Sequence, residues 1–157
     1  MKNYWLMKSE PDVYSIDDLK RDKTTYWDGV RNYQARNFLR DKMKKGDLAF
    51  FYHSNAEPSG IAGIVEIVKE GYPDPSAFEQ KDIHYDPKSI KEKPVWFVVE
   101  IRFVKKFKRL VSLQEIKRKP ALRNMQLLRS ARLSVQPVSP AEWKEILTFS
   151  GQTASGI

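Results

Sequence analysis

The sequence predicts a single α+β domain in which a barrel-like β-sheet is flanked by short helices. Its length of 157 residues suits one domain. Short apolar runs with strand-like patterns occur along the chain, and helix-start signals stand between them. Closing such a sheet would hide its edge strands. We place the domain at residues 1–150 and expect the Ser/Gly/Thr-rich residues 151–157 to form a flexible tail.

Composition narrows the class of protein. Hydrophobic residues make up 41% of the chain, which is enough for a core. The net charge of +8 favours a polyanionic partner, because each phosphate that a protein neutralises releases counterions; a merely soluble basic protein is the alternative. The absence of cysteine excludes disulfides, thiolate zinc sites and cysteine catalysis. No run approaches the ~18 apolar residues of a membrane helix, so we expect no membrane partner. We expect a monomer that is cytoplasmic in a bacterium or nuclear in a eukaryote.

Residues 4–8 predict the first strand, in which Trp5 and Met7 share one face. Ser15, with Asp18 three residues on, then opens a short helix, and acidic groups in its first turn complement the helix dipole. The residues that follow lead into a polar, aromatic stretch that is described below.

Two strands and a helix are predicted in the middle of the chain. Asn32 can cap a helix whose apolar side chains recur at helical spacing as far as Met43. Residues 48–52 and 61–68 are strands joined by a Pro/Gly turn, and we expect them to pair as a hairpin. Residues 72–93, with three prolines and scattered charges, predict a long loop. A loop of that length in a compact domain is often functional.

The C-terminal part begins with the longest predicted strand, residues 95–104, in which one face is fully apolar. A capping box at Ser112 starts a short helix. Residues 132–138 alternate polar with apolar and predict the last strand. Ser139 as N-cap, followed by Pro140 at the first helical position, predicts the final helix.

The sequence offers little for catalysis or cofactor binding. No glycine-rich phosphate-binding motif is present, and no serine lies in a G-x-S-x-G elbow. His53 and His84 are the two histidines, and neither has metal-ligand spacing. We therefore expect no catalytic residue, no metal and no cofactor.

The stretch from Trp27 to Asn32 instead combines an aromatic ring, a carboxylate, a glycine, a guanidinium and an amide. Proteins bind single nucleobases by stacking on aromatic rings and by hydrogen bonds to the polar base edge. Trp27 can stack, Asp28 can accept from an exocyclic amine, and Arg31 can hold a phosphate or fix Asp28 in place. Polar groups at the ends of two strands, Ser9 and residues 53–55, could converge on this stretch.

A structural interpretation of the same residues stays open. Trp27 could be a core tryptophan, and Asp28-Gly29 could be a turn. Asn32 could serve only as a helix cap, and His53 could be a strand-end histidine with a satisfied hydrogen bond.

Several ordered segments of the chain match one family. They are Trp5–Pro11, Trp27–Asn37, Phe50–Asn55, Gly60–Gly63, Tyr72–Pro75, Tyr85–Ser89 and Arg132–Val138. On these segments the sequence resembles the EVE domain family. The resemblance implies a PUA-like fold, a small curved or closed β-barrel of about five to six mainly antiparallel strands with flanking short helices. It also implies a relation to YTH domains, which read methylated adenine in RNA, and a partner DNA or RNA that carries a modified base.

The resemblance also implies the pocket residues. The pocket would be lined by Ser9, Trp27, Asp28, Gly29, Val30, Arg31, Asn32, His53, Ser54 and Asn55. For the opposite wall we predict Tyr85 and Phe78 from the long loop, with Trp5 behind them. For phosphate contacts we predict Arg36, Arg40, Lys105 and Arg132.

The function expected on these grounds is a non-catalytic reader of a methylated or hydroxymethylated cytosine. One alternative is a binder of a free modified nucleoside, for which the basic surface would be incidental. The other is a nuclease or base-processing enzyme that uses Asp28 and His53.

Overall fold

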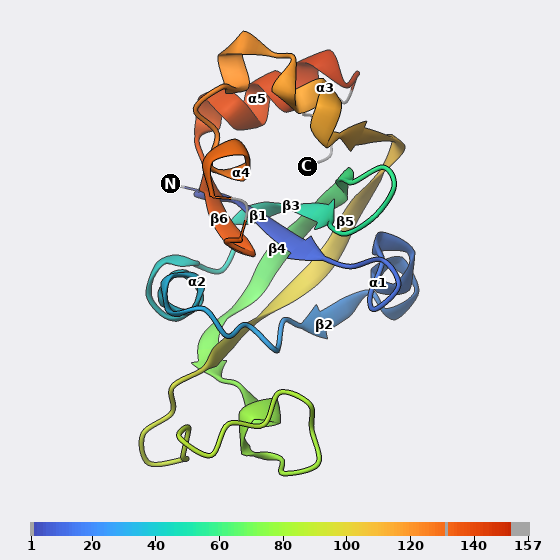
Figure 1. The fold of residues 1–157 in the computed structure, drawn as a ribbon. Coiled ribbons are helices and arrows are strands. Elements are labelled where there is room, and N and C mark those ends of the chain that lie inside the picture. Colours follow the sequence, from blue (N-terminus) through green and yellow to red (C-terminus); the bar gives the residue numbers. More distant parts are fainter. Residues whose placement is uncertain (1, 131, 152–157) are drawn as a thin grey trace.

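The computed structural model describes residues 2–130 and 132–151, and one six-stranded sheet runs through it (Figure 1). The strands are β1 (Tyr4–Ser9), β2 (Thr24–Tyr26), β3 (Leu48–His53), β4 (Gly60–Pro73), β5 (Phe97–Ser112) and β6 (Val135–Val138). Their order is β2-β5-β4-β3-β1-β6. β1 and β3 pair parallel, and the other four pairings are antiparallel. The predicted α+β class is confirmed, and so is the hairpin of β3 and β4.

The sheet ends at β2 on one side and at β6 on the other. No pairing joins these two strands within residues 2–130 and 132–151, so the predicted closure into a barrel is not confirmed. β4 and β5 are long, and their register shifts at four points. Such irregularities bend strands and increase their twist, which shapes an open sheet without closing it.

Short helices lie between the strands and after the last strand. They are α1 (Ile16–Asp22), α2 (Tyr33–Asn37), the π-helix η1 (Phe38–Lys42), the 3-10 helix η2 (Pro75–Phe78), α3 (Leu113–Lys117), the 3-10 helix η3 (Pro120–Leu122), α4 (Gln126–Arg129) and α5 (Pro140–Phe149). Ser15, Ser112 and Ser139 each form the expected capping box with the acidic residue three positions on. In the described residues no helix is long and apolar enough to cross a membrane.

Two hydrophobic clusters make up the core. Trp5 and Met7 of β1 belong to one cluster, with α1 and α2, while Leu6 belongs to the other, with α5. The predicted alternation along β1 is therefore confirmed. In the second cluster Trp143 of α5 stacks on Phe50, with 3.9 Å between ring centroids. Since both clusters bury aromatic rings, the sheet is held from both sides.

The predicted long loop connects β4 to β5. We call residues 74–96 the lobe; it projects beyond the ends of β4 and β5, away from the helices of the C-terminal part (Figure 1). The lobe has little regular structure apart from η2. The predicted end of the longest strand at residue 104 is wrong, because β5 stays paired with β4 as far as Ser112.

Candidate functional site

A cavity of about 460 Å³ opens at the C-terminal end of β1. Its walls come from β1 and the loop after it, from β2 and the residues that follow, and from the lobe. The lining residues are Lys8, Ser9, Val13, Tyr14, Thr25, Tyr26, Trp27, Asp28, Gly29, Val30, Arg31, His84 and Ser134. Its volume lies in the range of small-ligand pockets, which is roughly 300–1,000 Å³.

The aromatic wall is built by β2 and its continuation. β2 pairs with β5, and the Trp27 amide extends that pairing by donating to the Val99 carbonyl at 2.8 Å. The Trp27 ring packs edge-on against Phe51, with centroids 5.6 Å apart, and is 8% exposed. Trp27 is thus a core residue that also lines the cavity. Tyr26, next to it, is 45% exposed and offers more ring surface.

Asp28 places a carboxylate in this wall. Its side chain is about one-third exposed, and burial, followed by repulsion from Asp74, raises the pKa of Asp28. A carboxylate that has lost part of its hydration gains by accepting hydrogen bonds from a ligand. Asp28 is therefore the strongest acceptor available on the cavity wall.

Position 29 requires glycine for two reasons, its backbone conformation and the lack of space for a side chain. Its φ of +76° lies in the left-handed region that favours glycine. A Cβ at this position would lie 2.5 Å from Nε2 of His84. The Gly29 amide donates to Oδ2 of Asp74 at 3.0 Å. The lobe thus packs directly on this glycine.

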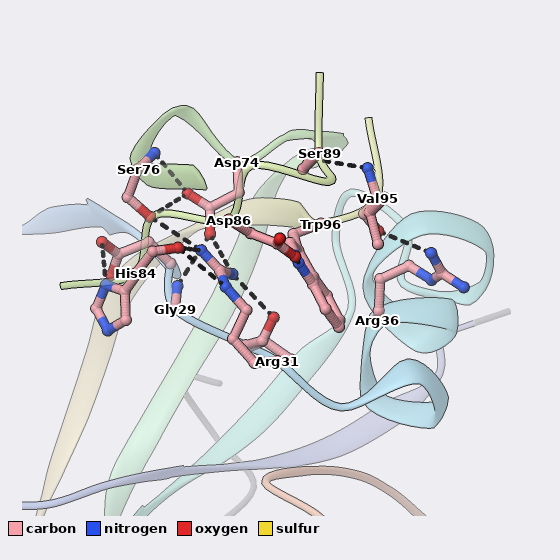
Figure 2. Close-up of polar contacts among 12 residues, drawn as sticks. Gly29, Arg31, Arg36, Asp74, Ser76, His84, Asp86, Ser89, Val95 and Trp96 are labelled. Atoms are coloured by element: carbon pink, nitrogen blue, oxygen red, sulfur yellow. Dashed lines mark hydrogen bonds and ion pairs between the residues drawn. The ribbon is translucent and has the colours of Figure 1, made fainter. Parts of the chain in front are cut away.

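Asp74 links the lobe to the cavity wall (Figure 2). Its side chain is fully buried and pairs with Nη1 of Arg31 at 3.0 Å. The Ser76 amide and hydroxyl also donate to Asp74, at 2.8 and 2.6 Å. Burial raises the pKa of Asp74, but hydrogen bonds from Ser76, the Gly29 amide and Arg31 outweigh burial and hold that pKa below its usual value. We call these contacts the Asp74 network.

Arg31 provides a second link, to His84 of the lobe (Figure 2). Its Nη2 and Nε donate to the His84 carbonyl at 2.5 and 3.2 Å. Its guanidinium also lies over the Trp96 ring, 5.3 Å from the centroid. These contacts set the position of His84, whose ring enters the cavity.

The His84 ring lies between two carboxylates. Its Nδ1 is 3.3 Å from Oδ1 of Asp82 and 3.8 Å from Oδ2 of Asp28. The same Nδ1 is buried without a hydrogen bond of good geometry. The two distances place Nδ1 beside both carboxylates, but Oδ2 of Asp28 is too distant for a hydrogen bond, and Oδ1 of Asp82 does not lie in the direction that a hydrogen bond to Nδ1 requires. We take the direction as decisive for Asp82, because hydrogen bonds weaken steeply when they are misaligned.

Comparison with known proteins places this chain in a family. The sequence profile of the EVE domain matches residues 3–149. The chain belongs to the EVE domain family. Thymocyte nuclear protein 1 of Gallus gallus is 49% identical to it over 93% of this chain and 68% of that protein.

Solved structures agree with this EVE domain closely. A hypothetical protein from Leishmania major superposes with a TM-score of 0.93 at 45% identity, covering 96% of each chain. The human THYN1 protein, crystallised in complex with DNA that contains 5-methylcytosine, gives a TM-score of 0.91 at 46% identity and covers 97% of this chain and 99% of that chain.

Six of the eleven predicted pocket residues line the cavity of this EVE domain. They are Ser9, Trp27, Asp28, Gly29, Val30 and Arg31. Ser9 donates to the Tyr14 carbonyl at 2.6 Å, which holds the loop after β1 against the cavity.

The other predicted residues lie outside the cavity and have structural partners. Asn32 caps α2 by accepting from the Ala35 amide. His53 accepts from the Ile16 amide through Nε2 at 3.1 Å, and burial lowers its pKa. The Ser54 amide donates to the backbone of β1, and Asn55 donates to Glu10, so these groups stabilise the turn beside the cavity.

The predicted opposite wall is formed differently. Tyr85 and Phe78 line a separate hollow of about 240 Å³ on the lobe itself. Trp5 is buried against Phe38, with centroids 5.3 Å apart. His84, one residue before Tyr85, lines the cavity instead. The lobe does provide a wall, but the turn at Asp82 to Tyr85 points His84, and not Tyr85, into the cavity.

The four predicted phosphate-binding residues do not line the cavity. Arg36 donates to the Val95 carbonyl and lies over the Tyr33 ring. Arg40 pairs with Asp41, Lys105 lies on β5, and Arg132 is exposed.

Sequence reasoning did not find Asp74, Ser76, His84, Tyr14 or Tyr26. One local signal was present for Asp74, because an aspartate followed by a proline is typical of a helix N-cap with proline at the first helical position. Its side chain does accept from the Ser76 amide in that way. Nothing local indicated that the same carboxylate would also bind Arg31.

Proposed function

We propose that this EVE domain is a non-catalytic reader that holds one modified cytosine of a DNA strand in the cavity. The observation that carries the proposal is the Asp28 carboxylate, partly desolvated and set beside aromatic rings in a cavity of base-like size. The complex of the human relative with 5-methylcytosine DNA supports the choice of base.

Each part of the cavity has a role in this proposal. Asp28 accepts from the exocyclic amine of cytosine, a hydrogen bond that is strengthened by charge. Tyr26 and Trp27 give an apolar surface for the ring and for the 5-methyl group. Burying one methyl group contributes ~0.8 kcal/mol, which corresponds to about a fourfold gain in affinity.

In this proposal the phosphates of the DNA strand pass the opening of the cavity and carry negative charge there. Lys8 lies in the cavity wall, and the protein as a whole carries a net charge of +8. Binding should therefore weaken as salt rises, because counterions are released on association. The protein acts where DNA lies, in the nucleus of a eukaryote or the cytoplasm of a bacterium.

Binding at one fixed salt concentration tests the proposal. Short DNA strands with cytosine, 5-methylcytosine or 5-hydroxymethylcytosine at one position are compared by fluorescence anisotropy, together with an RNA strand that carries 5-methylcytosine and with the free nucleosides. We expect a modified DNA strand to bind several-fold more tightly than the unmodified one. Equal affinity for all DNA strands would refute the modified-base part, and tighter binding of the RNA would refute the choice of DNA.

Two variants link the binding to the cavity. Asp28→Asn should lower the affinity for the modified strand by roughly tenfold, because a charge-assisted hydrogen bond is lost. The matched control is Asp41→Asn, since Asp41 is an exposed carboxylate that pairs with Arg40. Equal effects of the two variants would contradict the assignment of Asp28.

The enzyme alternative requires Asp28 and His53 to act together. His53 does not line the cavity and instead accepts the Ile16 amide at the start of α1. A geometry with both groups on one substrate is therefore not supported. Recovery of the bound oligonucleotide with unchanged mass is the expected result, and a product of lower mass would favour the enzyme.

A further inference from the structure

Ile83 is the most exposed large apolar side chain in residues 2–130 and 132–151, with 92% of its surface accessible. It lies in the lobe, in a β-turn that the Tyr85 amide closes by donating to the Asp82 carbonyl at 3.1 Å. The Asp82 side chain tightens this turn by accepting the His84 amide at 2.8 Å. The turn therefore presents Ile83 outward on a defined backbone.

The turn is also held against the cavity. His84 follows Ile83 directly, and its carbonyl accepts two hydrogen bonds from Arg31. Arg31 in turn pairs with the buried Asp74. An exposed isoleucine thus sits on a turn held by hydrogen bonds, one residue from a side chain that lines the cavity.

Two other exposed apolar side chains lie in the wall of the cavity. Six large apolar side chains are exposed in the described part of the chain: Val13, Tyr26, Tyr33, Ile83, Tyr85 and Ile90. Val13, which is 76% exposed, and Tyr26 both line the cavity. Single exposed apolar residues are ordinary. Here two of them line the cavity, and a third, Ile83, directly precedes His84 of the cavity wall, so the three together offer apolar surface to a ligand at this site.

We propose that Ile83 is a wedge that enters the base stack of duplex DNA and occupies the space left by the base that moves into the cavity. This inference rests on the proposed function. A base inside a duplex cannot reach a cavity in the protein, so it must leave the stack. Proteins that unstack a base step insert apolar side chains, isoleucine among them.

The side chain and the turn that carries it suit this role. Isoleucine is β-branched and stiff at χ1, so little side-chain freedom is lost when it is buried. The hydrogen bonds of the turn and of Arg31 have already ordered the backbone, which removes a further entropic cost of binding. The partner is the stacked interior of a DNA duplex, whose base faces are apolar.

Binding to duplex and to single-stranded DNA distinguishes the role of Ile83 from that of the cavity. Ile83→Ala is compared with the unchanged protein on a 5-methylcytosine duplex and on the same strand alone. We expect binding to the duplex to weaken by roughly tenfold and binding to the single strand to change by less than about twofold, because only the duplex has a stack to open. Ile90→Ala, an exposed isoleucine of the same lobe, is the matched control and should leave both affinities unchanged.

A fluorescent base gives a second readout. With 2-aminopurine next to the methylcytosine of the duplex, the unchanged protein should raise the fluorescence as the step unstacks, and Ile83→Ala should raise it less. Unchanged duplex affinity and unchanged fluorescence in Ile83→Ala would overturn the wedge, and so would an equal loss on duplex and single strand. A duplex-specific loss in Val13→Ala but not in Ile83→Ala would overturn the assignment to Ile83. Failure of the unchanged protein to prefer methylcytosine in either form would overturn the proposed function instead.

Discussion

Removal of the Asp74 carboxylate is the most informative perturbation of the cavity wall. In Asp74→Ala four donors lose their acceptor: the Gly29 amide, Nη1 of Arg31, and the amide and hydroxyl of Ser76. Asp74 itself has no solvent exposure, so water does not replace it freely. The variant therefore removes the hydrogen bond that joins the lobe to Gly29.

The expected loss of stability in Asp74→Ala follows from how deeply Asp74 and Arg31 are buried. Removing one member of a buried ion pair costs about 3–5 kcal/mol. The Arg31 side chain is 24% exposed and recovers part of this by turning to water. We therefore expect the free energy of unfolding to fall by about 2–4 kcal/mol. Asp74→Asn keeps an acceptor for Ser76 and should lose roughly half as much.

Urea denaturation and methylcytosine binding measure the two consequences. The urea concentration at the midpoint of unfolding should be lower in Asp74→Ala. The affinity for methylcytosine DNA should also be weaker, because Arg31 and His84 lose their fixed positions. Hydrogen exchange should show the loss first at the Gly29 and Ser76 amides if the lobe opens locally. A change in stability below ~0.5 kcal/mol, with unchanged exchange, would refute the reasoning. Asp41→Ala is the control, since exposed ion pairs contribute at most ~1 kcal/mol.

The pH dependence of stability has a definite sign. The pKa of Asp74 in the folded protein is lowered from 3.8, so the stability that this group adds is fully present above pH 3.8. That stability is lost as the pH falls below 3.8 through the folded pKa. Asp74→Asn should lack this part of the acid transition, which urea midpoints measured from pH 5 down to pH 2 would show.

Three further variants probe the wall and the core. Gly29→Ala should destabilise the fold by about 1–2 kcal/mol and weaken binding, because it strains a positive φ and displaces the His84 ring; unchanged denaturation and affinity would contradict this. Asp28→Asn should raise the melting temperature at pH 7 and lower the affinity for methylcytosine DNA. The pKa of Asp28 is raised in the folded protein, so the stability that this group adds is lost as the pH rises through the folded pKa, and the ionised carboxylate is unfavourable at pH 7. A lower melting temperature of the variant at pH 7 would refute this sign. Trp143→Ala should cost about 3–5 kcal/mol, because the ring stacks on Phe50, yet leave the affinity of the folded protein unchanged; weaker binding at full folding would show coupling across the sheet.

Local patterns predicted much of the fold. The alternation of Trp5 and Met7 with Leu6 identified β1 and its two faces, and the capping box at Ser139 identified the start of α5. β2 was missed because three residues, Thr24–Tyr26, carry no periodicity and become a strand only by pairing with β5. The continuation of β5 to Ser112 was missed because a basic sequence resembles a loop unless its partner strand is known.

The candidate site was predicted only where its residues are neighbours in the sequence. Trp27 to Arg31 are consecutive, and their side-chain chemistry could be interpreted without the fold. The contact of Arg31 with Asp74 joins residues 43 positions apart. Tyr85 was predicted for the facing wall in place of His84 because a loop's aromatic content is visible in sequence, whereas the direction of a turn is not.

By itself, then, the sequence determined the family, the strand faces, the helix caps and the polar aromatic stretch at Trp27, since each depends on residues a few positions apart. The tertiary structure decided that the sheet stays open, that the lobe returns to Gly29 through Asp74, and that His84 completes the cavity while Ile83 faces outward. These features depend on which distant segments meet. A buried carboxylate is stable only where several donors converge on it, and such convergence is a property of the folded chain.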